Sequence, residues 1–245
     1  MPSFLLEICL DSLASIREAV RGGAHRVELC DNLMEGGTTP SAGLIKQARA
    51  VATDIGLQVM IRPRGGDFLY DDDEFAAMRH DVELAGELGA DGVVLGLLCA
   101  DGRVDAERTT RLVELARPMN VTFHRAFDVT PDPHGALADI IALGCDRILT
   151  SGQQRSVLDG LPLITDLVQA AGDDVIIMPG CGITPHNFAR IHEACGASEY
   201  HLKIDGHRDS RMTYRAAGVP MGGTLTPPEF GRAITDGDAV RALLE

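Results

Sequence analysis

Eight short apolar segments alternate with helical patterns along this chain of 245 residues. The predicted strands are Phe4–Leu10, His25–Cys30, Leu57–Arg62, Gly92–Gly96, Val121–His124, Arg147–Thr150, Val175–Met178 and Glu199–Lys203. Eight strands, each followed by a helix, are typical of a single-domain (β/α)8 TIM barrel. We therefore expect one domain over residues 1–245, with an irregular segment at 205–235 and a final helix at 236–244.

A repeated glycine favours the closed barrel over an open sheet. Gly23, Gly89, Gly144 and Gly196 each end a predicted helix just before an even-numbered strand. A residue that follows a helix often adopts the left-handed conformation, which glycine tolerates best. The competing fold, an open doubly wound sheet, would place a Gly-x-Gly-x-x-Gly turn after the first strand. This chain has Leu10-Asp11-Ser12-Leu13 there.

Composition excludes some classes of partner. The chain has 22 Lys and Arg against 36 Asp and Glu, a net charge of −14, which argues against nucleic acid or an anionic membrane surface as a partner. No apolar run approaches the length of a membrane span. The six cysteines show no zinc-type spacing, and the N-terminus does not read as a secretion signal. We therefore expect reduced thiols in a cytoplasmic protein.

Two strands repeat the pattern apolar, Glu, apolar, Cys. In Leu6-Glu7-Ile8-Cys9-Leu10 and Val27-Glu28-Leu29-Cys30, the period of two predicts that both Glu and both Cys point into the barrel. A buried carboxylate is costly unless it is paired or binds a ligand. The pattern thus indicates either a polar site or interior ion pairs that only stabilise the fold.

More polar residues follow at the carboxyl ends of the strands, where TIM barrels carry their chemistry. They are Arg62, His124, Ser151, Gly180, His201 and Lys203. Arg62 and Lys203 can oppose the charge of Glu7 and Glu28, and the two histidines can titrate. This convergence predicts a ligand site at the barrel mouth.

Several blocks of this chain resemble the CutC family. They are Leu6–Cys9, Arg26–Cys30, Glu35–Ser41, Ile61–Phe68, Val121–Asp128 and Ile148–Gly152, and the resemblance extends to about Gly222. It implies a cytoplasmic (β/α)8 barrel, often oligomeric, that is linked to copper homeostasis. Cys9 and Cys30 match the positions proposed in the family to bind Cu(I). Two stretches depart from the family pattern near the expected pocket: His201-Leu202-Lys203, where small residues are usual after the His, and Arg215-Ala216-Ala217, where Arg-Asn is common.

The first hypothesis is therefore a copper homeostasis protein that binds Cu(I) through Cys9 and Cys30. Soft thiolates suit Cu(I), and Met60 or a histidine could supply a third ligand. The alternative for the two cysteines is that they are small core residues.

The second hypothesis is an enzyme that acts on a small phosphorylated or carboxylated metabolite. Arg62, Arg64 and the Gly65-Gly66 turn could clamp an anion. The glycines of Gly180-Cys181-Gly182, before a helix expected to start at Thr184, could cradle a phosphate. The candidates for proton transfer are Glu7, Glu28, His124 and His201. For Lys203 we expect an ion pair with a glutamate, and for Arg125 one with Asp128. A third possibility is a homo-oligomeric scaffold that uses segment 205–235 as an interface.

Overall fold

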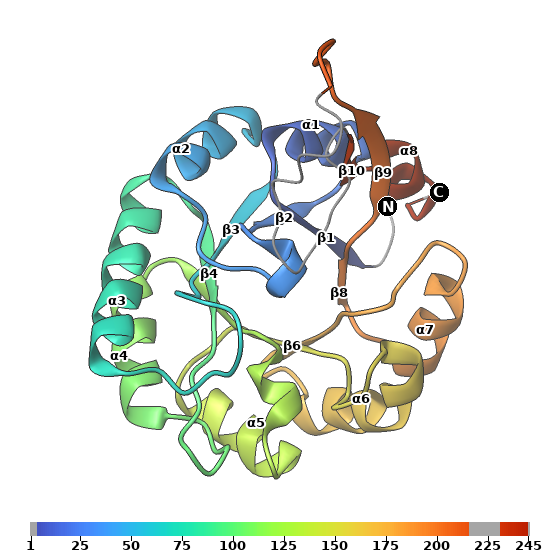
Figure 1. Ribbon diagram of the computed structural model, residues 1–245. Coiled ribbons are helices and arrows are strands. Elements are labelled where there is room, and N and C mark those ends of the chain that lie inside the picture. The colour runs from blue at the N-terminus through green and yellow to red at the C-terminus, as the bar shows by residue number, and fades with distance from the viewer. Residues whose placement is uncertain (1–3, 216–230, 245) are drawn as a thin grey trace.

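Short runs of β-branched and apolar residues form eight parallel strands in the computed structural model, which describes residues 4–215 and 231–244. The strands are β1 (Leu5–Leu10), β2 (Arg26–Leu29), β3 (Gly56–Met60), β4 (Gly92–Leu95), β5 (Asn120–Phe123), β6 (Arg147–Thr150), β7 (Ile176–Pro179) and β8 (Glu199–Leu202). All eight lie where the sequence predicts them, within one or two residues at most ends. They stand at the centre of Figure 1, with the helices around them.

The strands close into a barrel. Their order is β7-β6-β5-β4-β3-β2-β1-β8, so the first strand pairs with both the second and the last. A parallel bridge between Gly180 and His201 joins the ends of β7 and β8 and completes the ring. The predicted (β/α)8 barrel is confirmed, and the open sheet, in which the first and last strands would not meet, is wrong.

Helices cover the outside of the barrel. The α-helices are α1 (Leu13–Gly22), α2 (Ala42–Val51), α3 (Asp72–Glu87), α4 (Ala106–Ala116), α5 (Pro133–Ala142), α6 (Val157–Ala171), α7 (Phe188–Cys195) and α8 (Gly237–Ala242), and two 3-10 helices are η1 (Leu33–Glu35) and η2 (Arg125–Val129). Ser12 and Ser41 accept hydrogen bonds from the first turns of α1 and α2, as helix N-caps do. Gly23, Gly89, Gly144 and Gly196 all have a positive φ, between 61° and 88°, as predicted.

The apolar core lies between the strands and the helices. Leu6, Ile8 and Leu10 of β1 point outward and are buried among helix residues such as Ile16. The alternate residues point into the barrel, and there the interior is polar. Glu7 and Glu28, both almost fully buried, lie on this inner side, as strand parity predicts. None of the helices in residues 4–215 and 231–244 is long and apolar enough to cross a membrane.

Two predictions at the C-terminal end need correction. The ends of the segment expected to be irregular are strands: β9 (Asp205–Asp209) pairs antiparallel with β10 (Gly231–Thr235) beside α1 and α8 (Figure 1). The middle of that segment, including the Ala217 departure, lies outside the described residues. The helix expected to start at Thr184 begins instead at Phe188. The final helix is close to its predicted place, with Asp236 as its N-cap.

Candidate functional site

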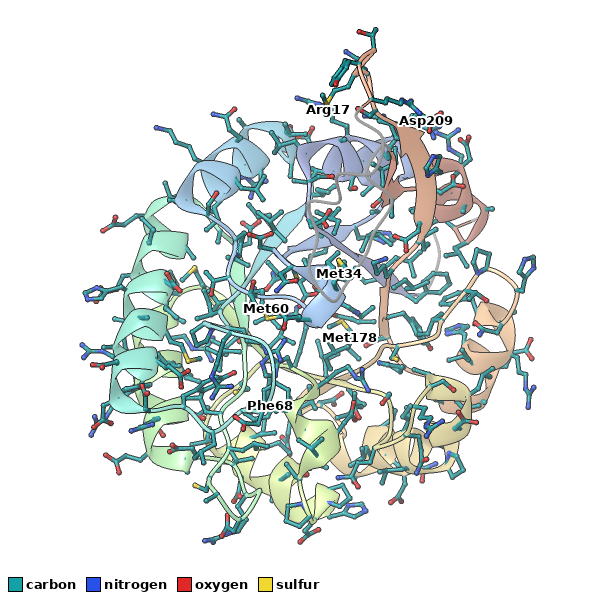
Figure 2. All side chains as sticks on the ribbon, in the orientation of Figure 1. Arg17, Met34, Met60, Phe68, Met178 and Asp209 are labelled. Carbon is teal, nitrogen blue, oxygen red and sulfur yellow. The ribbon has the colours of Figure 1, made fainter. Side chains whose placement is uncertain are left out.

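A cavity of about 620 Å³ opens at the carboxyl ends of the strands, at the mouth of the barrel. It is lined by Cys9, Glu28, Leu33, Glu35, Gly36, Met60, Arg62, Phe68, His124, Arg125, Leu149, Cys181, Gly182, Ile183, Thr184, His201 and Lys203. Figure 2 shows Met60 inside the ring of helices and Phe68 on the loop after β3. The volume is in the range of small-molecule sites, about 300–1,000 Å³. The predicted pocket is therefore present at the predicted end of the barrel.

The two cysteines meet at the inner end of this cavity. The Sγ atoms of Cys9 and Cys30 are 4.0 Å apart, although the strand register sets Cys9 opposite Glu28. Neither thiol is in a disulfide. Both pack with Met60 in a small apolar cluster. The hydrogen bond with Cys9, together with burial, raises the pKa of the Cys30 thiol well above its usual value. Cys30 is therefore protonated at neutral pH.

Gly37 packs directly over this sulfur cluster. A Cβ atom at Gly37 would lie 3.1 Å from Cys30 Sγ and 3.6 Å from Met60 Cε. The Gly37 backbone also has a φ of 92°, which side chains rarely adopt. The loop after β2 can therefore cover both sulfur-containing residues only because position 37 is glycine.

Glu28 and His201 form a buried pair beside the thiols. Glu28 Oε2 and His201 Nε2 are 2.8 Å apart. Burial alone would raise the pKa of Glu28, but the charge of His201 holds it below its usual value. Burial alone would lower the pKa of His201, but Glu28 raises it well above its usual value. The pair is therefore ionic. Ligand atoms of Cys9, Glu28 and Cys30 all lie within 4.8 Å of one another, a possible metal-binding set.

Glu7 lies deeper and is held by a separate network. Its carboxylate pairs with Arg26, which also contacts Glu199 at 2.5 Å. Arg147 approaches the same Glu199 at 2.6 Å. Glu7 is fully buried and does not line the cavity, although one of its oxygens is 3.9 Å from His201 Nε2. Glu7 therefore belongs to an interior ion pair, which was one of the two predicted roles for the inward-facing glutamates. Glu28 lines the pocket, which was the other.

The expected balance of Glu7 and Glu28 by Arg62 and Lys203 is wrong. The Arg62 guanidinium donates to the carbonyl oxygens of Glu35 and Gly37, and to that of Gly66, each at 2.9 Å. It therefore ties together the loops after β2 and β3. The Lys203 ammonium donates to Asp205, close to the cavity rim. Both residues still line the cavity, so their charges act on its contents.

Three of the predicted anion-binding positions have other roles. Arg64 pairs with Glu74 at 2.5 Å and does not line the cavity. Ser151 is buried and donates to Asp128 at 2.9 Å. A Cβ at Gly180 would lie 2.5 Å from Leu149 Cδ1, so this glycine serves packing at the closure of the barrel.

One amide beside the expected phosphate cradle is occupied within the protein. The Thr184 amide donates to Asn187 Oδ1 at 2.8 Å instead of pointing free into the cavity. Gly182 does line the cavity, as predicted. The predicted Arg125–Asp128 ion pair is present at 2.7 Å, and Arg125 lines the cavity as well.

His124 lines the cavity from the position just after the end of β5. Its ring is buried, and its centroid is 5.0 Å from that of Phe68. Burial, together with the nearby charge of Arg62, lowers the pKa of His124 to about 4. His124 is therefore a neutral imidazole at pH 7.

Sequence reasoning missed most of the apolar lining. These residues are Leu33, Phe68, Leu149 and Ile183, and the half-buried Cys181 joins them. Phe68, Cys181 and Ile183 come from loops and Leu33 from the short helix η1, where strand periodicity gives no direction, whereas Leu149 lies within β6. The single available signal was the Gly182 turn, because glycine there indicates a backbone that other residues avoid.

Comparisons with known proteins agree with the geometry. The model of the CutC family matches residues 4–206. The chain belongs to the CutC family. A CutC family protein of Chromobacterium violaceum is 53% identical over 241 residues, covering 98% of this chain and 97% of the relative. A mouse protein named copper homeostasis protein cutC homolog is 49% identical, covering 98% of this chain and 88% of its own.

Solved structures place this CutC chain in the same fold. A crystal structure of CutC from Streptococcus agalactiae has a TM-score of 0.78 and 37% identity, covering 81% of this chain and 97% of that one. A thiamine phosphate pyrophosphorylase from Pyrococcus furiosus has a TM-score of 0.59 but only 16% identity, covering 99% of this chain and 94% of its own. The second likeness shows the barrel fold alone. Membership of CutC links this chain to copper homeostasis.

Proposed function

We propose that this CutC protein binds one Cu(I) ion between Cys9 and Cys30. The sulfur separation carries the proposal. We take the copper–sulfur bond to be about 2.3 Å long, the length of a zinc–thiolate bond. Two sulfur atoms 4.0 Å apart then subtend an angle of about 120° at a metal ion bound to both. That angle suits three-coordinate binding, and Met60 supplies a soft third ligand in the same cluster.

The buried setting supports a soft ion. Cys30 is fully buried and Cys9 is 9% exposed, so only Cys9 borders the cavity through which an ion would enter. Both thiols must lose their protons to bind a metal, so binding releases protons. Free thiols persist in a reducing compartment, and we accordingly propose that the protein acts in the cytoplasm. A homo-oligomeric state stays a prediction.

A titration with Cu(I) under anaerobic, reducing conditions tests this function. In competition with a Cu(I) chelator, the wild-type protein should take up one ion per chain. A Cys9→Ser/Cys30→Ser variant should lose this binding. Cys145→Ser is the matched control, because Cys145 is a buried free cysteine outside the cavity. Unchanged affinity in the double variant would refute the proposal.

We propose, as a second function, that the cavity binds a small organic anion. Its volume of about 620 Å³ is far larger than an ion needs. Four positively charged side chains line it, Arg62, Arg125, Lys203 and the paired His201, against the carboxylates of Glu28 and Glu35. Asp128 and Asp205, which pair with Arg125 and Lys203, do not line the cavity, so the lining itself is positive, and in a chain with a net charge of −14 this favours an anion.

Calorimetry with 2-oxoglutarate and dihydroxyacetone phosphate tests this second function. Lys203→Ala removes a cation from the rim and should weaken binding of either probe several-fold, more at low salt. Lys46→Ala on the exposed face of α2 removes the same charge elsewhere and should have no effect. If neither probe binds the wild-type protein, the second function is wrong and the Cu(I) proposal is unaffected.

A further inference from the structure

His124 is held in one orientation by a backbone amide. It follows β5 and forms the N-cap of η2, where its Nδ1 atom accepts a hydrogen bond from the Ala126 amide at 3.2 Å. An accepting Nδ1 carries no proton. Because the ring is neutral at pH 7, its one proton is on Nε2. The fold thus sets the tautomer of His124.

The Nε2 atom is left without a partner in the part of the chain that the structure describes. It is buried, and none of the side chains or backbone groups in residues 4–215 and 231–244 hydrogen-bonds to it. His124 is 4% exposed and lines the cavity. A buried N–H without an acceptor is unfavourable, so native structures rarely keep one without a bound partner. The donor can therefore bond an acceptor atom that a ligand or a water brings to this wall of the cavity.

The neighbouring strand leaves room for this ring. A Cβ atom at Gly96, just after β4, would lie 2.5 Å from His124 Nδ1 and 2.6 Å from Cε1. No side chain fits there while the imidazole keeps its position. Phe68 packs on the ring as well. Gly96, Phe68 and the Ala126 amide together fix the direction of the donor, so its placement is not a chance rotamer.

We propose that the cavity binds a small anion that carries a carbonyl group, and that His124 donates its Nε2–H to the carbonyl oxygen. The inference rests on the second proposed function and specifies its ligand. A neutral imidazole can polarise a carbonyl without surrendering its proton, and a bond from the other ring nitrogen to a helix N-terminus favours this state. Arg125 and Lys203 on the rim provide the charge that attracts the anionic part.

Matched pairs of probes separate the carbonyl from the anion. 2-Oxoglutarate differs from 2-hydroxyglutarate, and dihydroxyacetone phosphate from glycerol 3-phosphate, by a carbonyl in place of an alcohol. In at least one pair, we expect the carbonyl compound to bind wild-type protein at least tenfold more tightly by calorimetry. Equal binding within both pairs would overturn this inference alone. Absence of binding by all four compounds would also overturn the second proposed function.

Two variants and one spectrum test the donor itself. His124→Phe keeps a flat ring without the N–H and should abolish the preference for the carbonyl compound. His124→Gln keeps a neutral N–H and should retain part of it. Thermal unfolding checks that both variants fold. Nitrogen NMR of the wild-type imidazole should show a protonated Nε2 and a bare Nδ1 at pH 7, with the Nε2 signal shifting when the carbonyl probe binds. A protonated Nδ1, or a preference that survives in His124→Phe, would refute the assignment.

Discussion

His124 also links stability to pH. Its pKa falls from 6.5 to about 4 in the folded state. As the pH drops below 6.5, the unfolded chain takes up a proton at this residue and the folded protein does not, so stability falls until the pH reaches about 4. The difference in pKa corresponds to about 3 kcal/mol.

We therefore expect His124→Gln to have a flatter pH profile of unfolding free energy than the wild type between pH 6.5 and 4. Urea unfolding at several pH values measures this. The comparison isolates His124, because the carboxylates that also titrate are common to both proteins. Parallel profiles would show that the wild-type imidazole is not held neutral.

Strand parity found the inward residues but not their partners. The alternation of side chains along a strand placed Glu7, Glu28, Cys9 and Cys30 inside the barrel. This alternation can be read from the sequence of each strand alone. Which cation meets which carboxylate depends on strand register and depth. Arg26 has the same inward parity as Glu28, yet its pairing with Glu7 follows from a register that no local pattern encodes.

At the scale of elements, Gly180 shows how tightly β7 meets its neighbours. A Cβ there would also lie 3.1 Å from His201 Cβ, in addition to its clash with Leu149. Gly180→Ala should therefore destabilise the protein by about 1–3 kcal/mol through overpacking. Gly43→Ala is the control: this position in α2 has no atoms within 4 Å of a new Cβ, and alanine should stabilise the helix by up to about 1 kcal/mol.

Denaturant unfolding of both glycine variants decides the point. If the Gly180→Ala protein is as stable as the wild type, the residues around the end of β7 can shift to accept a new methyl group at little cost in free energy. In that case the position of His201 across the closing bridge would not depend on this glycine.

The misplaced start of α7 has a local physical reason. Thr184-Pro185 has the composition of an N-cap followed by the first helical residue. In the structure, Asn187 accepts from the Thr184 amide and donates its own side-chain amide to the Gly182 carbonyl at 2.8 Å. These bonds hold a turn ahead of the helix. A polar turn and a helix start use the same residues, so sequence alone did not separate them.

For the whole molecule, the alternation of strand and helix patterns and the repeated glycine before the even-numbered strands were enough to predict the barrel. Eight βα units have few ways to bury both faces of a sheet. The cavity mouth was predictable for the same reason. Its lining was not, since the loops that carry Leu33, Phe68 and Ile183 have no period. Tertiary contacts such as those of Arg62 with two loops set their positions.

A buried charge network joins the first and last strands of the barrel. Arg26 on β2 bridges Glu7 on β1 and Glu199 on β8, and its side chain is 5% exposed. Burial alone would lower the pKa of Arg26, but the two carboxylates raise it. Arg26→Met should destabilise the protein by about 3–5 kcal/mol, since a buried carboxylate loses its partner.

Glu7 is the carboxylate that loses its close partner and keeps only His201 at 3.9 Å, whereas Glu199 keeps Arg147 at 2.6 Å. The double variant Arg26→Met/Glu7→Gln should therefore recover part of the stability lost in Arg26→Met, as urea unfolding at pH 7 will measure. Arg111→Met is the control, because its pair with Glu107 on α4 is exposed and should contribute less than about 1 kcal/mol. If Arg26→Met costs no more than Arg111→Met, the network does not hold β1 and β8 together, and backbone pairing alone closes the barrel.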